Sequence, residues 1–290
     1  LVLAASPGFA ADKVSEMFNH ANALAGQRSW DAAVNQYREV VRLAPSFLEA
    51  HYNLGLALQA MGDFDGAVNE FRQALRLRPE FLEARSSLGF ALVRSGQTDL
   101  AVAEYRDLTK LKPDSADAHY NLANALAAKG DLDSAIASFR EAIRLRPDLA
   151  QAHNNLANAL RSQGKAEAAV AEYREAMRLS KPQAYLYFNL ANALADAGKF
   201  GEALDQYALA LMLEPNDAEI HNNLGVAYAA QGNLDRAAGE YRLAVALKPD
   251  FARAHYNLGL LRDRQSDRNA ALNEYGEAIR LKPDYAAAHF

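Results

Sequence analysis

Histidine is the residue type in this chain that invites a catalytic or metal-binding interpretation, because seven are present and cysteine is absent. Six recur at intervals of 34 residues or a multiple of 34, at His51, His119, His153, His221, His255 and His289. Equivalent positions in stacked helices lie about 8–10 Å apart, whereas each ligand of a metal ion lies about 2 Å from it. The series therefore predicts packing residues along one seam, and no metal or other cofactor.

Asparagine is the second residue type with a regular spacing. Seven asparagines share one position at the same interval: Asn19, Asn53, Asn121, Asn155, Asn189, Asn223 and Asn257, here called the ladder asparagines. Four more follow three residues later, at Asn22, Asn124, Asn158 and Asn192. A side-chain amide both donates and accepts hydrogen bonds, so such a row can match a peptide backbone of any sequence. The alternative is that these amides bond to one another within the protein.

The segment that positions these residues is a pair of amphipathic helices. In residues 51–80, apolar residues at offsets of three and four predict a helix on each side of Gly62, and Pro79 ends the second. Each helix leaves an apolar stripe that a neighbour must cover. The same string returns every 34 residues, as one leucine series shows: Leu54, Leu88, Leu122, Leu156, Leu190, Leu224 and Leu258. The glycine between the helices of repeats two to seven predicts a left-handed backbone there.

This repeat length and order of small and large residues resemble the tetratricopeptide (TPR) repeat. The resemblance implies an all-α fold, a right-handed superhelical solenoid of eight helix–turn–helix repeats plus the start of a ninth. The repeats lie near residues 14–47, 48–81, 82–115, 116–149, 150–183, 184–217, 218–251 and 252–285, and residues 286–290 begin the ninth.

Residues 1–13 precede the repeats and are largely apolar. The sequence Gly8-Phe9-Ala10 resembles the end of a secretory signal peptide, which would indicate an exported protein, periplasmic or extracellular. An ordered extension that covers the first helix, in a cytoplasmic protein, is the alternative.

Composition narrows the classes of function. The net charge of −5 argues against nucleic acid as a partner, and no apolar run approaches the roughly 18 residues of a membrane span. No glycine-rich phosphate loop and no nucleophile–base constellation occurs. We therefore expect a protein without catalytic residues, whose partner is another polypeptide or further copies of itself.

The first helices of TPR arrays line a concave groove, and the ladder resembles the asparagine ladder of O-linked N-acetylglucosamine transferase, whose amides hold an extended peptide. The resemblance implies groove binding by the ladder and by its four companions. Aromatic residues would add anchors: Tyr52, Tyr120, Tyr185, Phe188 and Tyr256. Acidic residues near them, such as Glu49 and Glu83, predict a neutral or basic segment and make a carboxylate terminus a poor ligand.

Three functions follow from this pattern. The first is a scaffold that binds an extended polypeptide in the groove. The second is a structural subunit that assembles head to tail into a filament through its ends, with Ala271, Leu272 and Ala278 on the outer side of the last complete helix, residues 269–282. The third is the recognition arm of a larger glycosyltransferase-like enzyme.

Overall fold

The computed structural model describes residues 7–284, with side chains from residue 12 onwards. Over this range the secondary structure consists of sixteen α-helices, and no strand occurs in it. The chain divides into two compact units, Leu1–Pro147 and Asp148–Phe290. Each unit is a stack of helix pairs, and each is described here by itself.

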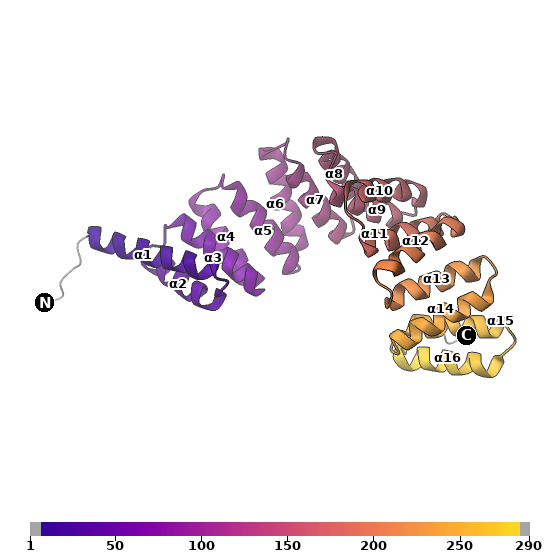
Figure 1. Cartoon of the computed structure of the whole chain (residues 1–290). Helices are drawn as coiled ribbons and strands as arrows, with labels where there is room; N and C mark the ends of the chain where they lie inside the picture. Colours follow the sequence, from indigo (N-terminus) through magenta and orange to yellow (C-terminus); the bar gives the residue numbers. More distant parts are fainter. Residues whose placement is uncertain (1–6, 285–290) are drawn as a thin grey trace. The chain divides into compact units, whose positions relative to one another are not determined.

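The first unit contains four helix pairs, coloured indigo to purple in Figure 1. Their helices are α1 (Pro7–Gly26), α2 (Trp30–Leu43), α3 (Leu48–Met61), α4 (Phe64–Leu77), α5 (Leu82–Arg94), α6 (Thr98–Leu111), α7 (Ala116–Lys129) and α8 (Leu132–Leu145).

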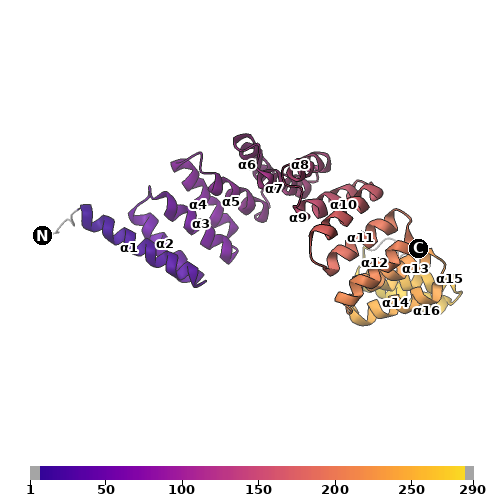
Figure 2. The same cartoon turned by 45° about the horizontal axis from the view of Figure 1, so that its top comes forward.

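The second unit repeats the arrangement with four further pairs, and Figure 2 shows the pairs from another side. Its helices are α9 (Ala150–Ser162), α10 (Ala166–Leu179), α11 (Ala184–Asp196), α12 (Phe200–Leu213), α13 (Ala218–Ala230), α14 (Leu234–Leu247), α15 (Ala252–Arg264) and α16 (Arg268–Leu281). The chain is thus an all-α solenoid of eight helix–turn–helix repeats over the described residues, as predicted.

The two helices of a pair do not have equivalent neighbours. Within each unit, the first helices of successive pairs contact one another: α1 contacts α3, α3 contacts α5, and α11 contacts α13. Successive second helices make no comparable contact in the described chain. The stack is therefore tighter on the side of the first helices, which form the inner face of each unit.

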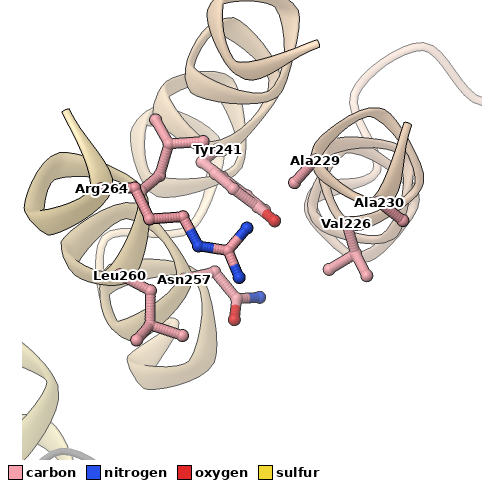
Figure 3. A pocket seen from close by; sticks show the side chains of 8 residues that line it. Val226, Ala229, Ala230, Tyr241, Asn257, Leu260 and Arg264 are labelled. Atoms are coloured by element: carbon pink, nitrogen blue, oxygen red, sulfur yellow. The ribbon is translucent and has the colours of Figure 1, made fainter. Parts of the chain in front are cut away.

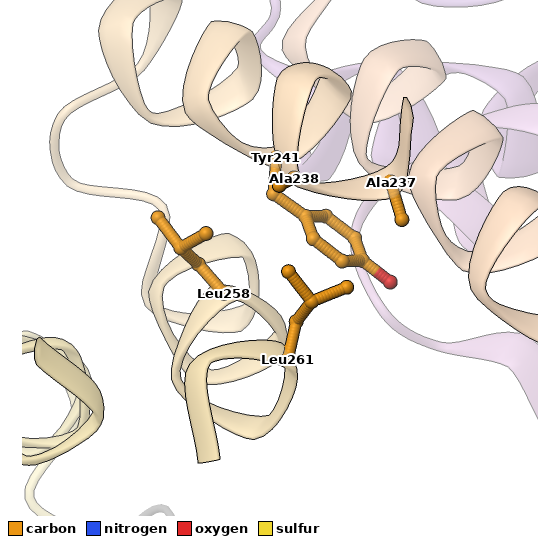
Figure 4. Packing of buried hydrophobic residues seen from close by; sticks show 5 residues of the cluster. All are labelled: Ala237, Ala238, Tyr241, Leu258 and Leu261. Carbon is orange, nitrogen blue, oxygen red and sulfur yellow. The ribbon is translucent and has the colours of Figure 1, made fainter. Parts of the chain in front are cut away.

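Small residues and one aromatic ring per repeat make the core. The alanines at the start of the second helices, such as Ala203 and Ala237, are fully buried. Figure 4 shows the ring of Tyr241 from α14 lying beside Leu258 and Leu261 of α15. A Cβ on Gly225 of α13 would come within 2.7 Å of that ring, so this glycine permits close contact between the two helices.

The turns confirm the prediction from glycine. Gly62, Gly96, Gly130, Gly164, Gly198 and Gly232 all have positive φ, between 73° and 87°. Arg28 and Ser266, which replace this glycine in the first and last repeats, adopt the same region, with φ of 59° and 64°. The turn is therefore set by the packing of the repeat, and the degenerate repeats adopt it at some cost in strain.

Two expectations for the ends need correction. The segment from Pro7 to residue 13 is not separate from the repeats, because it is helical and continuous with α1. In α16, Ala271 and Ala278 are buried inside their own repeat, and only Leu272, with 62% of its surface exposed, lies on the outside. Residues 286–290, predicted to begin a ninth repeat, lie outside the described residues.

No helix in the described range is both long and apolar enough to cross a lipid bilayer. The right-handed superhelix expected for the complete array stays a prediction.

Candidate functional site

Four histidines of the seam, His51, His153, His221 and His255, are buried inside the stack, whereas His119 is half-buried and His289 lies outside the described residues. His51 of α3 is buried, with Nδ1 2.6 Å from a carboxylate oxygen of Glu70 on α4 and Nε2 2.9 Å from the carbonyl oxygen of Pro45. A carbonyl and a carboxylate can only accept, so both contacts are hydrogen bonds when the ring is an imidazolium, in which both nitrogens donate. The bond to Glu70 raises the pKa of His51 above its ordinary value, against the opposing effect of burial.

The same arrangement recurs along the chain. His221 contacts Glu240 and the Pro215 carbonyl, and His255 contacts Glu274 and the Pro249 carbonyl. Arg85 takes the place of histidine in repeat three, with Glu104 and the Pro79 carbonyl as acceptors. The seam thus has a packing role, as predicted, but the glutamate 19 residues further on was missed by the sequence analysis. In the described residues, no group of three or more His, Asp or Glu could hold a metal ion.

Two ladder asparagines of the second unit, Asn223 and Asn257, are joined with Asn222 and the companion Asn192 in a hydrogen-bonded chain across three repeats. The Nδ2 group of Asn257 donates to Asn222, that of Asn222 to Asn223, and that of Asn223 to Asn192, each at 2.9 Å. The hydroxyl of Tyr207 donates to the same oxygen of Asn192 at 2.7 Å. One end of this chain of amides lies in the buried interior and the other on the inner face.

Further members of the ladder have comparable bonds. Asn53 and Tyr37 both donate to Asn22, at 2.9 and 2.6 Å, in the first unit. In the second unit Asn189 donates to Asn154 at 3.5 Å, and the amide of Asn154 donates to Asn155 at 3.0 Å. Each of these donor asparagines therefore uses one N–H group for a hydrogen bond within the protein, which is the alternative that the sequence left open. Each primary amide carries a second N–H group.

The companion asparagines differ in exposure. Asn192 is buried, whereas Asn158, which accepts from the Tyr173 hydroxyl at 2.5 Å, is exposed on α9. Asn121 and Asn124 are half-buried on α7.

The predicted aromatic anchors are largely part of the packing. Four of the five rings pack against the core aromatic ring of their own repeat, at centroid distances of 5.9–6.1 Å: Tyr52 with Phe71, Tyr120 with Phe139, Phe188 with Tyr207, and Tyr256 with the half-buried Tyr275. These four residues are half-buried, and Tyr185 alone of the five is exposed, at 47%. The sequence analysis did not predict these ring pairs.

Two pockets open on the inner face at equivalent positions, six repeats apart. The N-terminal groove pocket lies between α1 and α3, has a volume of about 290 Å³, and is lined by Asn22, Tyr37, Asn53 and Leu56 among others. The C-terminal groove pocket lies between α13 and α15, has a volume of about 260 Å³, and is lined at the same repeat positions by Val226, Tyr241, Asn257 and Leu260. Each pocket thus has a ladder asparagine on one wall and a core tyrosine at its base.

One cationic side chain, that of Arg264, also lines the C-terminal groove pocket. Figure 3 shows the hydroxyl of Tyr241, the amide of Asn257 and the guanidinium of Arg264 turned toward the same space, opposite Val226 and Ala229 of α13. Burial raises the pKa of Tyr241 to about 12, and the positive charge of Arg264 partly opposes that rise. The hydroxyl therefore stays protonated at neutral pH and can donate a hydrogen bond.

Of the predicted residues, the pockets contain Asn22, Asn53 and Asn257, together with residues that were not predicted to line the groove. These are Leu56, Leu260, Arg264 and the core tyrosines. The signal was present, because positions three and seven residues after a ladder asparagine follow it by one and two turns on the same helix face.

Comparison with known proteins agrees with the repeat pattern. Family models described as tetratricopeptide repeat match residues 21–62, 48–81, 87–150, 124–184, 191–232, 227–266 and 252–285. A search of the curated proteins found no match.

Three solved structures illustrate the similarity. One is described as YrrB, a TPR protein with an unusual peptide-binding site; it is 25% identical, with a TM-score of 0.52 over 64% of this chain and 95% of that chain. MamA from Desulfovibrio magneticus RS-1 is 26% identical, with a TM-score of 0.56 over 58% of this chain and 95% of that chain. The Cut9–Hcn1 structure, at 18% identity and a TM-score of 0.63, covers 94% of this chain and 54% of its own, and shows the fold alone.

Proposed function

Because the chain belongs to the tetratricopeptide repeat family, we propose that it is a non-enzymatic scaffold that binds an extended segment of another polypeptide. The binding surface is the inner face formed by the first helices. The observation that carries the proposal is the pair of pockets at equivalent repeat positions, each with a ladder asparagine beside an apolar wall.

The spacing of the repeats suits an extended ligand. Neighbouring first helices lie about 10 Å apart, and an extended chain advances ~3.3 Å per residue. About three ligand residues therefore pass each repeat, so side chains can enter pockets while backbone groups meet amides. The similar YrrB structure, whose title names a peptide-binding site, supports this class of ligand.

The apolar side chains of the inner face support the same proposal. Phe90, Val226 and Leu260 are exposed by 40–44% of their surface, all at one repeat position on first helices. Large apolar side chains exposed at a shared position are available for a ligand to cover.

Selection from a library of random linear peptides of about twelve residues, long enough to pass three to four repeats, tests the proposal. We expect wild-type protein to enrich a family of related sequences. Val226→Trp, which fills the C-terminal groove pocket, should weaken the binding of the enriched peptides at least tenfold. Leu243→Trp is the matched control, because Leu243 is 48% exposed on the second helix α14. Enrichment that Leu243→Trp abolishes and Val226→Trp leaves intact would contradict the proposal.

Head-to-tail assembly stays a prediction from the sequence. Of the three residues of α16 assigned to the contact, Leu272 alone is exposed.

A further inference from the structure

We propose that the C-terminal groove pocket receives an acidic side chain of the bound polypeptide, with glutamate as the best fit. This inference rests on the proposed function and names the chemistry of one subsite within it. It is carried by three polar groups that face one small, otherwise apolar space between α13 and α15.

The charge of the pocket is positive and comes from Arg264, whose side chain is exposed to solvent at the end of α15. Arg264 is the only charged side chain among the eight that line it. Arg264 makes no ion pair or hydrogen bond to another residue in the described part of the chain.

The hydroxyl of Tyr241 is the second feature of the pocket that points to a ligand. Tyr241 is 4% exposed, and it makes no hydrogen bond to another residue in the part of the chain that the structure describes. Its equivalents Tyr37 and Tyr207 each donate to an asparagine, but Val226 stands at that position here. A donor at the base of a pocket without an acceptor is suited to a ligand that brings one.

The remaining walls select the length of the ligand side chain. Val226, Leu260 and Leu261 present aliphatic groups around the polar base. The two methylene groups of glutamate can pack on these walls while its carboxylate accepts from the Tyr241 hydroxyl and a guanidinium N–H of Arg264. Such charge-assisted bonds are stronger than neutral ones, so the acidic form is preferred to its amide.

The position of Arg264 in the repeat is occupied by arginine in one other repeat, where the side chain already has a partner. Arg94, five repeats earlier on α5, also follows a ladder position by seven residues. Its guanidinium carbon lies 4.8 Å from the centroid of the Phe64 ring, so that cation is already engaged. Arg94→Gln is therefore the matched control for Arg264→Gln.

The random peptide library, selected in parallel on wild type, Arg264→Gln and Arg94→Gln, is the test. We expect an acidic residue at one fixed position of the sequences enriched by wild type and by Arg94→Gln, and loss of that preference with Arg264→Gln. For one enriched peptide with amidated C-terminus, Glu→Gln should weaken binding to wild type about tenfold or more. The same change should have little effect on binding to Arg264→Gln. Tyr241→Phe should also weaken binding of the glutamate-containing peptide, but by a smaller factor.

The outcomes separate the two proposals. Enriched peptides without an acidic position, or with one that Arg264→Gln leaves unchanged, would overturn this inference alone. A dependence on the free C-terminal carboxylate in place of an internal glutamate would also overturn it. Failure of every peptide to enrich would overturn both proposals.

Discussion

In repeats one and two, the hydroxyl of Tyr37 and the amide of Asn53 both donate to Asn22. In repeats seven and eight, Val226 occupies the place of Asn22, and the hydroxyl of Tyr241 faces an open pocket beside Arg264. The two pockets share their position in the repeat and their approximate volume. The difference indicates that one position can stabilise the stack or present donors to a ligand, depending on a single residue.

The largest expected effect is on the stability of the N-terminal groove pocket. Asn22→Val copies the C-terminal groove pocket and leaves two donors without their acceptor. We expect a loss of about 2 kcal/mol in the free energy of unfolding, measured by denaturant titration. Loss below ~0.5 kcal/mol would mean that these bonds add nothing to stability.

The tyrosine hydroxyls give the next effect. Tyr37→Phe removes a hydrogen bond of 2.6 Å and should lower the free energy of unfolding by about 1 kcal/mol. Tyr241→Phe removes a hydroxyl without a partner in the described chain and should cost less than ~0.5 kcal/mol. Equal losses in thermal or denaturant unfolding would remove the distinction between the two pockets.

The reverse exchange should have a smaller effect of opposite sign. Val226→Asn supplies the acceptor that Tyr241 lacks, and we expect a gain of up to about 1 kcal/mol in the free energy of unfolding. Binding of an enriched peptide should weaken in the same variant, because the hydroxyl is then occupied. A variant that gains stability and keeps full affinity would show that the Tyr241 hydroxyl does not contact the ligand.

A pH dependence should come from the seam and not from the pockets. The pKa of His51 is raised in the folded protein, chiefly by Glu70. Its stabilising contribution is therefore complete below the ordinary value of about 6.5 and is lost as the pH rises through the raised value. We expect the unfolding free energy of wild type to fall over this window more than that of His51→Gln. Peptide affinity should differ little between the two proteins, since His51 lines neither pocket.

Repetition made the fold predictable from the sequence. An unbroken leucine series fixes the register of repeats two to eight, and a glycine in each of repeats two to seven indicates the turn, so the order of the helices and the buried residues can be predicted. The turn at Arg28 and Ser266 shows that the packed repeat determines the backbone even where glycine is missing.

The site was less predictable because two residues on one helix face can have different partners. The spacing placed Asn53 and Asn257 on the inner face, but not their bonds to Asn22 and Asn222, which depend on how neighbouring repeats are offset. The expectation of a neutral or basic ligand considered acidic residues in the first turn of the first helices, such as Glu49. It did not place Arg264, in the last turn of α15, on the same helix face as the ladder asparagine two turns earlier.

The most direct test of groove binding is to observe methyl groups by NMR while an enriched peptide is titrated into selectively labelled protein. The proposal predicts shifts at Leu56, Val226 and Leu260 on the first helices, with little change at Leu77, Leu243 and Leu247 on the second helices. Shifts confined to the second-helix leucines would contradict the proposal.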